Sequence, residues 1–100
     1  WDQHHFEAVM TKYTETLDLI LSLLSSDPSL SGWQKTVQQV RDMGDVMTLD
    51  SRQEIKSWFG GMGSINDLYI MEYGQPSFEK NQQLSAALNA LYDLVISEQS

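Results

Sequence analysis

Residues 6–24, with the sequence FEAVMTKYTETLDLILSLL, decide the fold of this chain. Apolar residues recur there at steps of three and four positions, namely Phe6, Val9, Met10, Tyr13, Leu17, Ile20, Leu21 and Leu24. On a helix they fall within a stripe about 120° wide, which is typical of a helix that packs one face against a core. The pattern predicts a helix over residues 4–25 that ends at Ser25-Ser26-Asp27-Pro28, because proline disfavours helix at the residue before it.

Leu19 and Leu23 lie outside this stripe. Two alternatives remain open for them: they pack against a second neighbour in the core, or they form a surface for a partner.

Three further helices are expected downstream. One runs from about Gly32 to Met43 with Ser31 as its N-cap, and another begins after Asp50, which forms a capping box with Gln53. The last covers residues 78–97 and is capped by Ser77. Before it, residues 68–71 are expected to be extended, as one strand of a small hairpin that turns at residues 73–76. The fold class is therefore all-α: one compact four-helix domain over residues 1–100, with a glycine-rich turn and a short extended segment before the last helix.

The glycine-rich turn is the stretch Phe59-Gly60-Gly61-Met62-Gly63-Ser64-Ile65-Asn66-Asp67-Leu68, which holds three of the chain's six glycines. Successive glycines can expose backbone amides as an anion-binding nest. However, the phosphate-binding patterns Gly-x-Gly-x-x-Gly and Gly-Lys-Ser/Thr are missing. The favoured interpretation is a helix C-cap followed by a structural turn, made by Gly60, Gly61, Gly63 and Asn66. Asn66 and Asp67 are expected to hold it through bonds from their side chains to the backbone.

The charge of the chain narrows its class of partner. Fourteen acidic residues against six basic ones give a net charge of −8. This charge disfavours nucleic acid and anionic membrane surfaces as partners and favours a basic protein. Acidity that only maintains solubility is the alternative. The chain lacks cysteine, a secretory signal pattern and an apolar run long enough to span a membrane, so a cytoplasmic location is expected.

No pattern for catalysis or metal binding stands out. His4 and His5 are adjacent, so their side chains diverge on a helix and do not share a metal. The carboxylate pairs Glu15/Asp18 and Asp42/Asp45 are typical of a solvated helix face. We therefore expect a protein that is not an enzyme and uses neither a cofactor nor a metal.

The aromatic residues divide into two groups. Trp33 and Trp58 lie in predicted helices and are expected to pack in the core. Tyr69 and Tyr73 lie in the non-helical segment, where packing and partner binding are equally open alternatives.

The stretch from Trp58 to Leu68, with its Phe-Gly-Gly-Met-Gly-Ser-x-Asn-Asp-Leu signature, resembles an uncharacterised family of small bacterial helical domains. The resemblance extends to residues 33–40 and to the helix that begins near Asn81, and so covers about residues 30–97. It implies a helical fold and transfers no catalytic residue. Residues 68–76 and the long first helix are individual to this chain, which makes them the places expected for partner specificity.

Small size, acidity and loop aromatics together favour an immunity protein, an antitoxin that occludes the active site of a basic bacterial toxin. The candidate partner-binding residues are Glu7, Glu15, Asp18, Asp67, Tyr69, Glu72 and Tyr73. The alternatives are a regulatory or adaptor domain that self-associates through Leu19 and Leu23, and a small-molecule-binding domain that uses the glycine turn.

Overall fold

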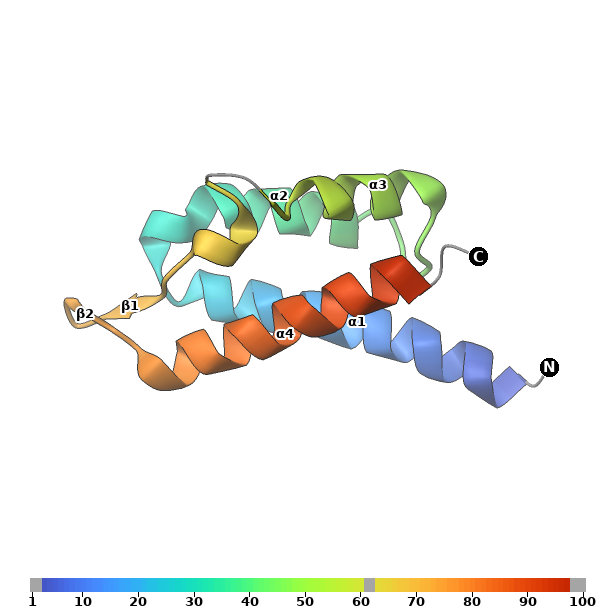
Figure 1. The fold of residues 1–100 in the computed structure, drawn as a ribbon, viewed down its shortest axis with the longest axis horizontal. Coiled ribbons are helices and arrows are strands. Elements are labelled where there is room, and N and C mark those ends of the chain that lie inside the picture. The colour runs from blue at the N-terminus through green and yellow to red at the C-terminus, as the bar shows by residue number, and fades with distance from the viewer. Residues whose placement is uncertain (1–2, 61–62, 98–100) are drawn as a thin grey trace.

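A computed structural model describes residues 3–60 and 63–97, and the side chains from residue 12 onward within those ranges. The described residues form the α-helices α1 (Gln3–Ser25), α2 (Ser31–Arg41), α3 (Leu49–Ser57) and α4 (Phe78–Ser97). Two short 3₁₀ helices, η1 (Pro28–Leu30) and η2 (Ile65–Asp67), and two strands, β1 (Met71–Glu72) and β2 (Gln75–Pro76), connect them. The predicted all-α class is confirmed (Figure 1).

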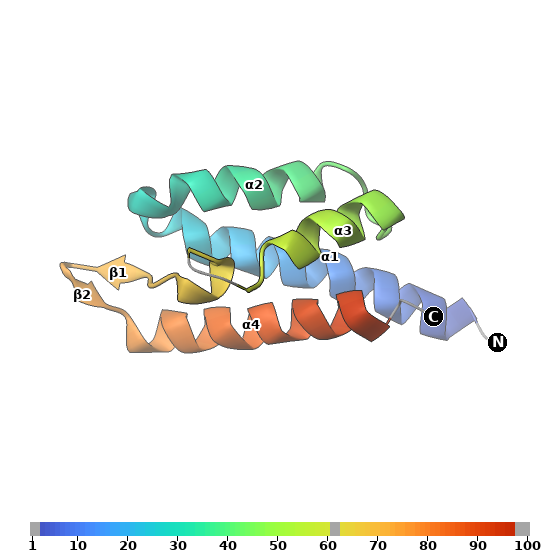
Figure 2. The same ribbon diagram turned by 45° about the horizontal axis from the view of Figure 1, so that its top comes forward.

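The helices form two layers. α1 packs against both α2 and α4, and α3 packs against α4. Figures 1 and 2 show α2 and α3 following one another along one side of the α1–α4 pair. The small hairpin projects at the end where α1 finishes and α4 begins, and the start of α1 lies at the opposite end. The described molecule is elongated, with extents of 49 × 25 × 20 Å.

The core is built on the predicted stripe of α1. Its buried hydrophobic side chains are Tyr13, Leu17, Ile20, Leu23, Leu24, Val37, Val40, Ile55, Trp58, Ile65, Ile70, Leu84, Ala87, Leu88, Leu91 and Val95. Trp33 packs against this core, and its ring meets that of Trp58 edge-on with centroids 6.4 Å apart, so the core interpretation of both tryptophans is confirmed. Leu23 is buried whereas Leu19 is 45% exposed, which leaves only Leu19 for a partner surface.

Two helix starts differ from the sequence expectation. The Asp27 side chain accepts a hydrogen bond from the Ser29 amide and caps η1, so α2 follows that turn directly with Leu30, not Ser31, at its N-cap. Proline at the first position of η1 suits this arrangement, because its fixed φ matches the turn and it has no amide to satisfy.

α3 begins earlier than predicted. Thr48, not Asp50, is its N-cap, and Thr48 and Ser51 exchange the two bonds of a capping box. Both Asp50 and Thr48 are followed three positions later by a side chain able to return the bond, and the local pattern alone did not separate them.

The predicted hairpin is present but displaced. Met71 pairs with Pro76 and Glu72 with Gln75, so the turn consists of Tyr73 and Gly74 alone. Residues 68–70 lie before the strand, and no strand of the described ranges pairs with them.

Candidate functional site

The turn of the hairpin has an uncommon backbone. Tyr73 has a φ of 53° and Gly74 a φ of 80°, and both are positive, as a two-residue type I′ turn requires. Glycine adopts such angles freely, but for tyrosine the left-handed region costs about 1–2 kcal/mol. The Tyr73 side chain is also fully exposed. Packing within this chain therefore does not offset the backbone cost.

Asp27 lies between α1 and α2, 44 positions before Met71, and its side chain anchors the hairpin. One of its carboxylate oxygens accepts bonds from the Ser29 amide (3.0 Å) and hydroxyl (2.7 Å), and the other accepts the Met71 amide (2.9 Å). The Met71 bond is the main cause that holds the pKa of Asp27 below its ordinary value, and the two Ser29 bonds act in the same direction. The α1–α2 connection and β1 thus share one charged acceptor.

Asn81 of α4 anchors the segment that leads into the hairpin. Its side-chain oxygen accepts the Ile70 amide at 2.7 Å, and its side-chain nitrogen donates to the Ile70 carbonyl at 3.1 Å. The Ser77 amide also donates to the Ile70 carbonyl. Asn81 therefore supplies the two bonds that a neighbouring strand would give to Ile70, whose side chain is completely buried.

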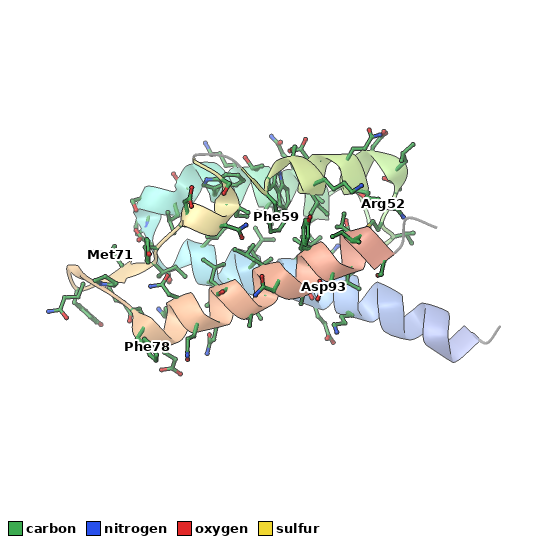
Figure 3. The ribbon with its side chains drawn as sticks, viewed as in Figure 1. Arg52, Phe59, Met71, Phe78 and Asp93 are labelled. Atoms are coloured by element: carbon green, nitrogen blue, oxygen red, sulfur yellow. The ribbon has the colours of Figure 1, made fainter. Side chains whose placement is uncertain are left out.

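Four apolar side chains stand out at this end of the molecule: Tyr69, Met71, Tyr73 and Phe78, here called the hairpin cluster. Their exposed fractions are 68%, 40%, 100% and 77%. Tyr69 and Met71 flank the buried Ile70, so the alternation of an extended chain directs both outward. Figure 3 shows Met71 on the hairpin and Phe78 at the start of α4, at the same end of the molecule.

Acidic side chains flank this cluster. Glu72 forms an ion pair with Lys80, which binds β1 to α4. Glu79, next to Phe78, is exposed and has no ion-pair partner among the described residues.

The glycine turn has the positive φ angles expected of a structural turn. Gly60 and Gly63 have φ angles of 91° and 76°, and the Ile65 amide closes the turn onto the Trp58 carbonyl at 2.9 Å. Asp67 holds the turn by accepting the Gly63 amide at 3.1 Å, as expected. Gly61 lies outside the described residues.

The expectation for Asn66 is wrong within the described residues. Its side chain makes no hydrogen bond to the turn there; it lines a hollow beside Gly60 instead. The aspartate at the next position takes the role that both residues were expected to share.

The acidic candidates do not gather around the hairpin. Glu15 and Asp18 are exposed on α1, where Asp18 pairs with Arg41 at 2.9 Å, and Arg41 also pairs with Asp45. The bond that Arg41 donates to Asp18 is the largest cause that raises the pKa of Arg41 above its ordinary value, and the bond to Asp45 acts in the same direction. Glu7 lies in the first part of α1, toward the opposite end from the hairpin, and its side chain is outside the described ones. The candidates that lie together at the hairpin are Tyr69, Glu72 and Tyr73.

Four residues of this site were not singled out in the sequence: Asp27, Met71, Phe78 and Asn81. For Asp27 a local signal existed, since aspartate before Pro28 and two positions before Ser29 is typical of a capped turn. Asn81 lies in the first turn of the last predicted helix, and its role depends on a carbonyl and an amide 11 positions away.

Within the described side chains, histidines and acidic residues form no group of three that could hold a metal ion. None of the described helices is both long enough and apolar enough to cross a membrane.

Comparison with known proteins gives one match. No curated protein and no solved structure matches the chain. The family described as "Domain of unknown function (DUF6966)" matches residues 27–77. The match includes the glycine turn and residues 68–76, which the resemblance alone had left outside the family pattern, and it ends before α4. Because the match covers half of the length of this chain, the chain belongs to this family of domains of unknown function.

Proposed function

We propose that this protein is a non-enzymatic immunity protein that binds a basic bacterial toxin and occludes its active site. The observation that carries the proposal is Tyr73: a fully exposed tyrosine held in a strained backbone at the tip of an anchored hairpin. Strain without a packing benefit in the free protein is typical of a residue kept for function.

The hairpin cluster has the composition of a protein-binding surface. Tyrosine, phenylalanine and methionine are enriched at the centres of interfaces, and the rigid aromatic side chains bury a large area at a small cost in side-chain entropy. The hydrogen bond that the Met71 amide donates to Asp27 and the two bonds between Asn81 and Ile70 hold the cluster's backbone before binding. A surface that is ordered in advance loses less entropy on association.

Charge favours a basic partner. The chain carries a net charge of −8, and Glu72 and Glu79 lie beside the cluster. Such a field speeds the encounter with a basic surface and weakens as salt increases. Toxins that act on nucleic acid have basic active sites, so an acidic protein with an aromatic anchor is suited to cover one. Glu15 and Asp18 on α1 would extend the acidic surface away from the hairpin, around the rim of the interface.

The test starts with affinity capture by the intact protein from its native host, at low and moderate salt, with identification by mass spectrometry. The captured protein is then purified and its toxic or enzymatic activity is measured with and without this protein. The proposal expects a basic partner whose activity is inhibited and whose binding weakens with salt. Failure to capture a partner, or capture of one whose activity is unaffected, would contradict it.

Two tyrosine variants locate the interface. Tyr73→Asn removes the aromatic anchor from a position that asparagine tolerates, so the variant is expected to stay folded and to bind at least about 30-fold more weakly, as is typical of a hot-spot residue. Tyr92→Asn, at a 41%-exposed tyrosine of α4, is the matched control and should bind normally. An equal loss of binding affinity with both variants would place the interface elsewhere.

A further inference from the structure

A hollow lies where the end of α3 and the glycine turn face α4, and we call it the α3–α4 hollow. Its volume is about 480 Å³, and it is lined by Lys56, Phe59, Gly60, Asn66, Asn89 and Tyr92. This size falls within the usual range of sites for small molecules, about 300–1,000 Å³. Lys56 belongs to α3, Asn66 to η2, and Asn89 and Tyr92 to α4. Three elements therefore converge on it.

Two aromatic rings form the apolar wall. The centroids of Phe59 and Tyr92 lie 5.0 Å apart with their planes tilted by 54°. Figure 3 shows Phe59 at the end of α3, on the side that faces α4. Tyr92 remains 41% exposed, so the pair is not closed off by the core. Such a wall suits the face or edge of another aromatic ring.

The polar part of the wall is free to bind. The side chains of Lys56, Asn66 and Asn89 have no hydrogen-bond or ion-pair partner within the described part of the chain. Arg41 and Lys80, in contrast, are both paired with carboxylates. None of the described residues of the wall is acidic, although acidic residues outnumber basic ones in the chain by more than two to one.

From these observations we propose that the α3–α4 hollow binds a small aromatic carboxylate. The ring of the ligand packs against Phe59 and Tyr92, and its carboxylate pairs with the Lys56 ammonium group. Asn66 and Asn89 each offer a donor and an acceptor to polar groups on the ring. Lys56 is the one cation among the described residues of the wall, which matches a ligand with one negative charge. The proposal uses a different surface from the hairpin cluster and does not depend on the proposed toxin binding.

The test is a titration of the isotopically labelled intact protein, followed by NMR of the backbone amides and the side-chain amides of Asn66 and Asn89. Three probes separate the components of recognition: benzoate has both an aromatic ring and the charge, benzamide has the aromatic ring without the charge, and cyclohexanecarboxylate has the charge on a saturated ring. Benzoate is expected to shift the resonances around the hollow, and each of the other two is expected to bind about fivefold more weakly. Inorganic phosphate is a fourth probe and is expected to leave these resonances unchanged.

A pair of lysine variants tests the proposed ion pair. Lys56→Gln is expected to weaken benzoate binding about fivefold, the upper effect of an exposed ion pair. Lys35→Gln changes the charge by the same amount on α2 and should leave binding unchanged. Any of four results would overturn the proposal. These are the absence of benzoate shifts at the hollow, equal binding of benzoate and cyclohexanecarboxylate, an equal response to phosphate, and equal effects of the two variants.

Discussion

The Asp27 carboxylate accepts the backbone amide of Met71 at 2.9 Å, across 44 positions of the sequence. The amide of Ser77, the residue before α4, donates to the carbonyl of Ile70, the neighbour of Met71. The family match runs from Asp27 to Ser77, so its first residue bonds to Met71 and its last residue bonds to the neighbouring Ile70. The two ends of the segment shared with the family thus meet at the hairpin, and its helices α2 and α3 pack along one side of the α1–α4 pair.

The carboxylate of Asp27 should make stability depend on pH. Its folded-state pKa is lowered from the ordinary 3.8, so its contribution is complete above that value and is lost as pH falls through the lower folded value. Asp27→Asn keeps an acceptor but has no charge. The melting temperature of the variant should lie below that of the wild type at pH 7, and the difference should shrink below pH 3.8. Thermal melts at several pH values measure it, and a difference that is constant with pH would contradict the assigned role.

Tyr73→Asn should stabilise the free protein. Asparagine followed by glycine is the preferred sequence of a type I′ turn, and the exposed Tyr73 ring contributes no packing. The free energy of unfolding should increase by about 0.5–1 kcal/mol, part of the cost of the left-handed conformation. Urea denaturation measures the change. A destabilised variant would mean that the tyrosine has a structural role in the free protein.

Loss of the Asn81 side chain should be costly. Asn81→Ala leaves the Ile70 amide without its partner and removes a bond from the Ile70 carbonyl, which lowers the free energy of unfolding by about 2 kcal/mol. Asn89→Ala is the matched control, because it makes the same change at an exposed position of α4 and should alter stability by less than about 0.5 kcal/mol. Hydrogen exchange should also become faster at the Ile70 amide. Similar stability of the two variants would contradict the anchoring role.

The start of α3 offers a direct comparison of two candidate caps. Thr48→Ala removes the acceptor of the Ser51 amide and should cost about 1 kcal/mol. Asp50→Ala removes only an exposed acidic side chain from the first turn, which costs about 0.3–0.5 kcal/mol. Chemical denaturation of both variants ranks them, and a larger loss for Asp50→Ala would restore the capping box expected from the sequence.

Two glycines should respond to alanine in opposite directions. Gly63 has a φ of 76°, so Gly63→Ala should destabilise the protein by about 1 kcal/mol. Gly32 lies in the first turn of α2 with no atom within 4 Å of an added methyl group, so Gly32→Ala should stabilise it by about 0.5 kcal/mol. Differential scanning calorimetry gives the two shifts. Shifts of the same sign would show that backbone conformation does not dominate at these positions.

The sequence by itself determined the helices. In both the stripe of α1 and the apolar face of α4, apolar residues recur at steps of three and four positions. Burial of such a stripe is the main source of helix stability in water. Positions such as Leu17, Ile20, Leu88 and Leu91 are therefore buried as the pattern predicts. The glycine turn was also predictable, because few residues other than glycine adopt the positive φ found at Gly60 and Gly63.

Only the tertiary structure decided how the non-helical segment is held and which residues meet there. Asp27, Ile70 and Asn81 are distant in sequence, and a polar side chain shows no sign in the sequence of which distant amide it will bond. The α3–α4 hollow has the same origin, since Lys56, Asn66 and Tyr92 come together only when α3 packs against α4. Periodic burial is a local property of the chain, whereas pairing between distant polar groups depends on the packing of the whole fold.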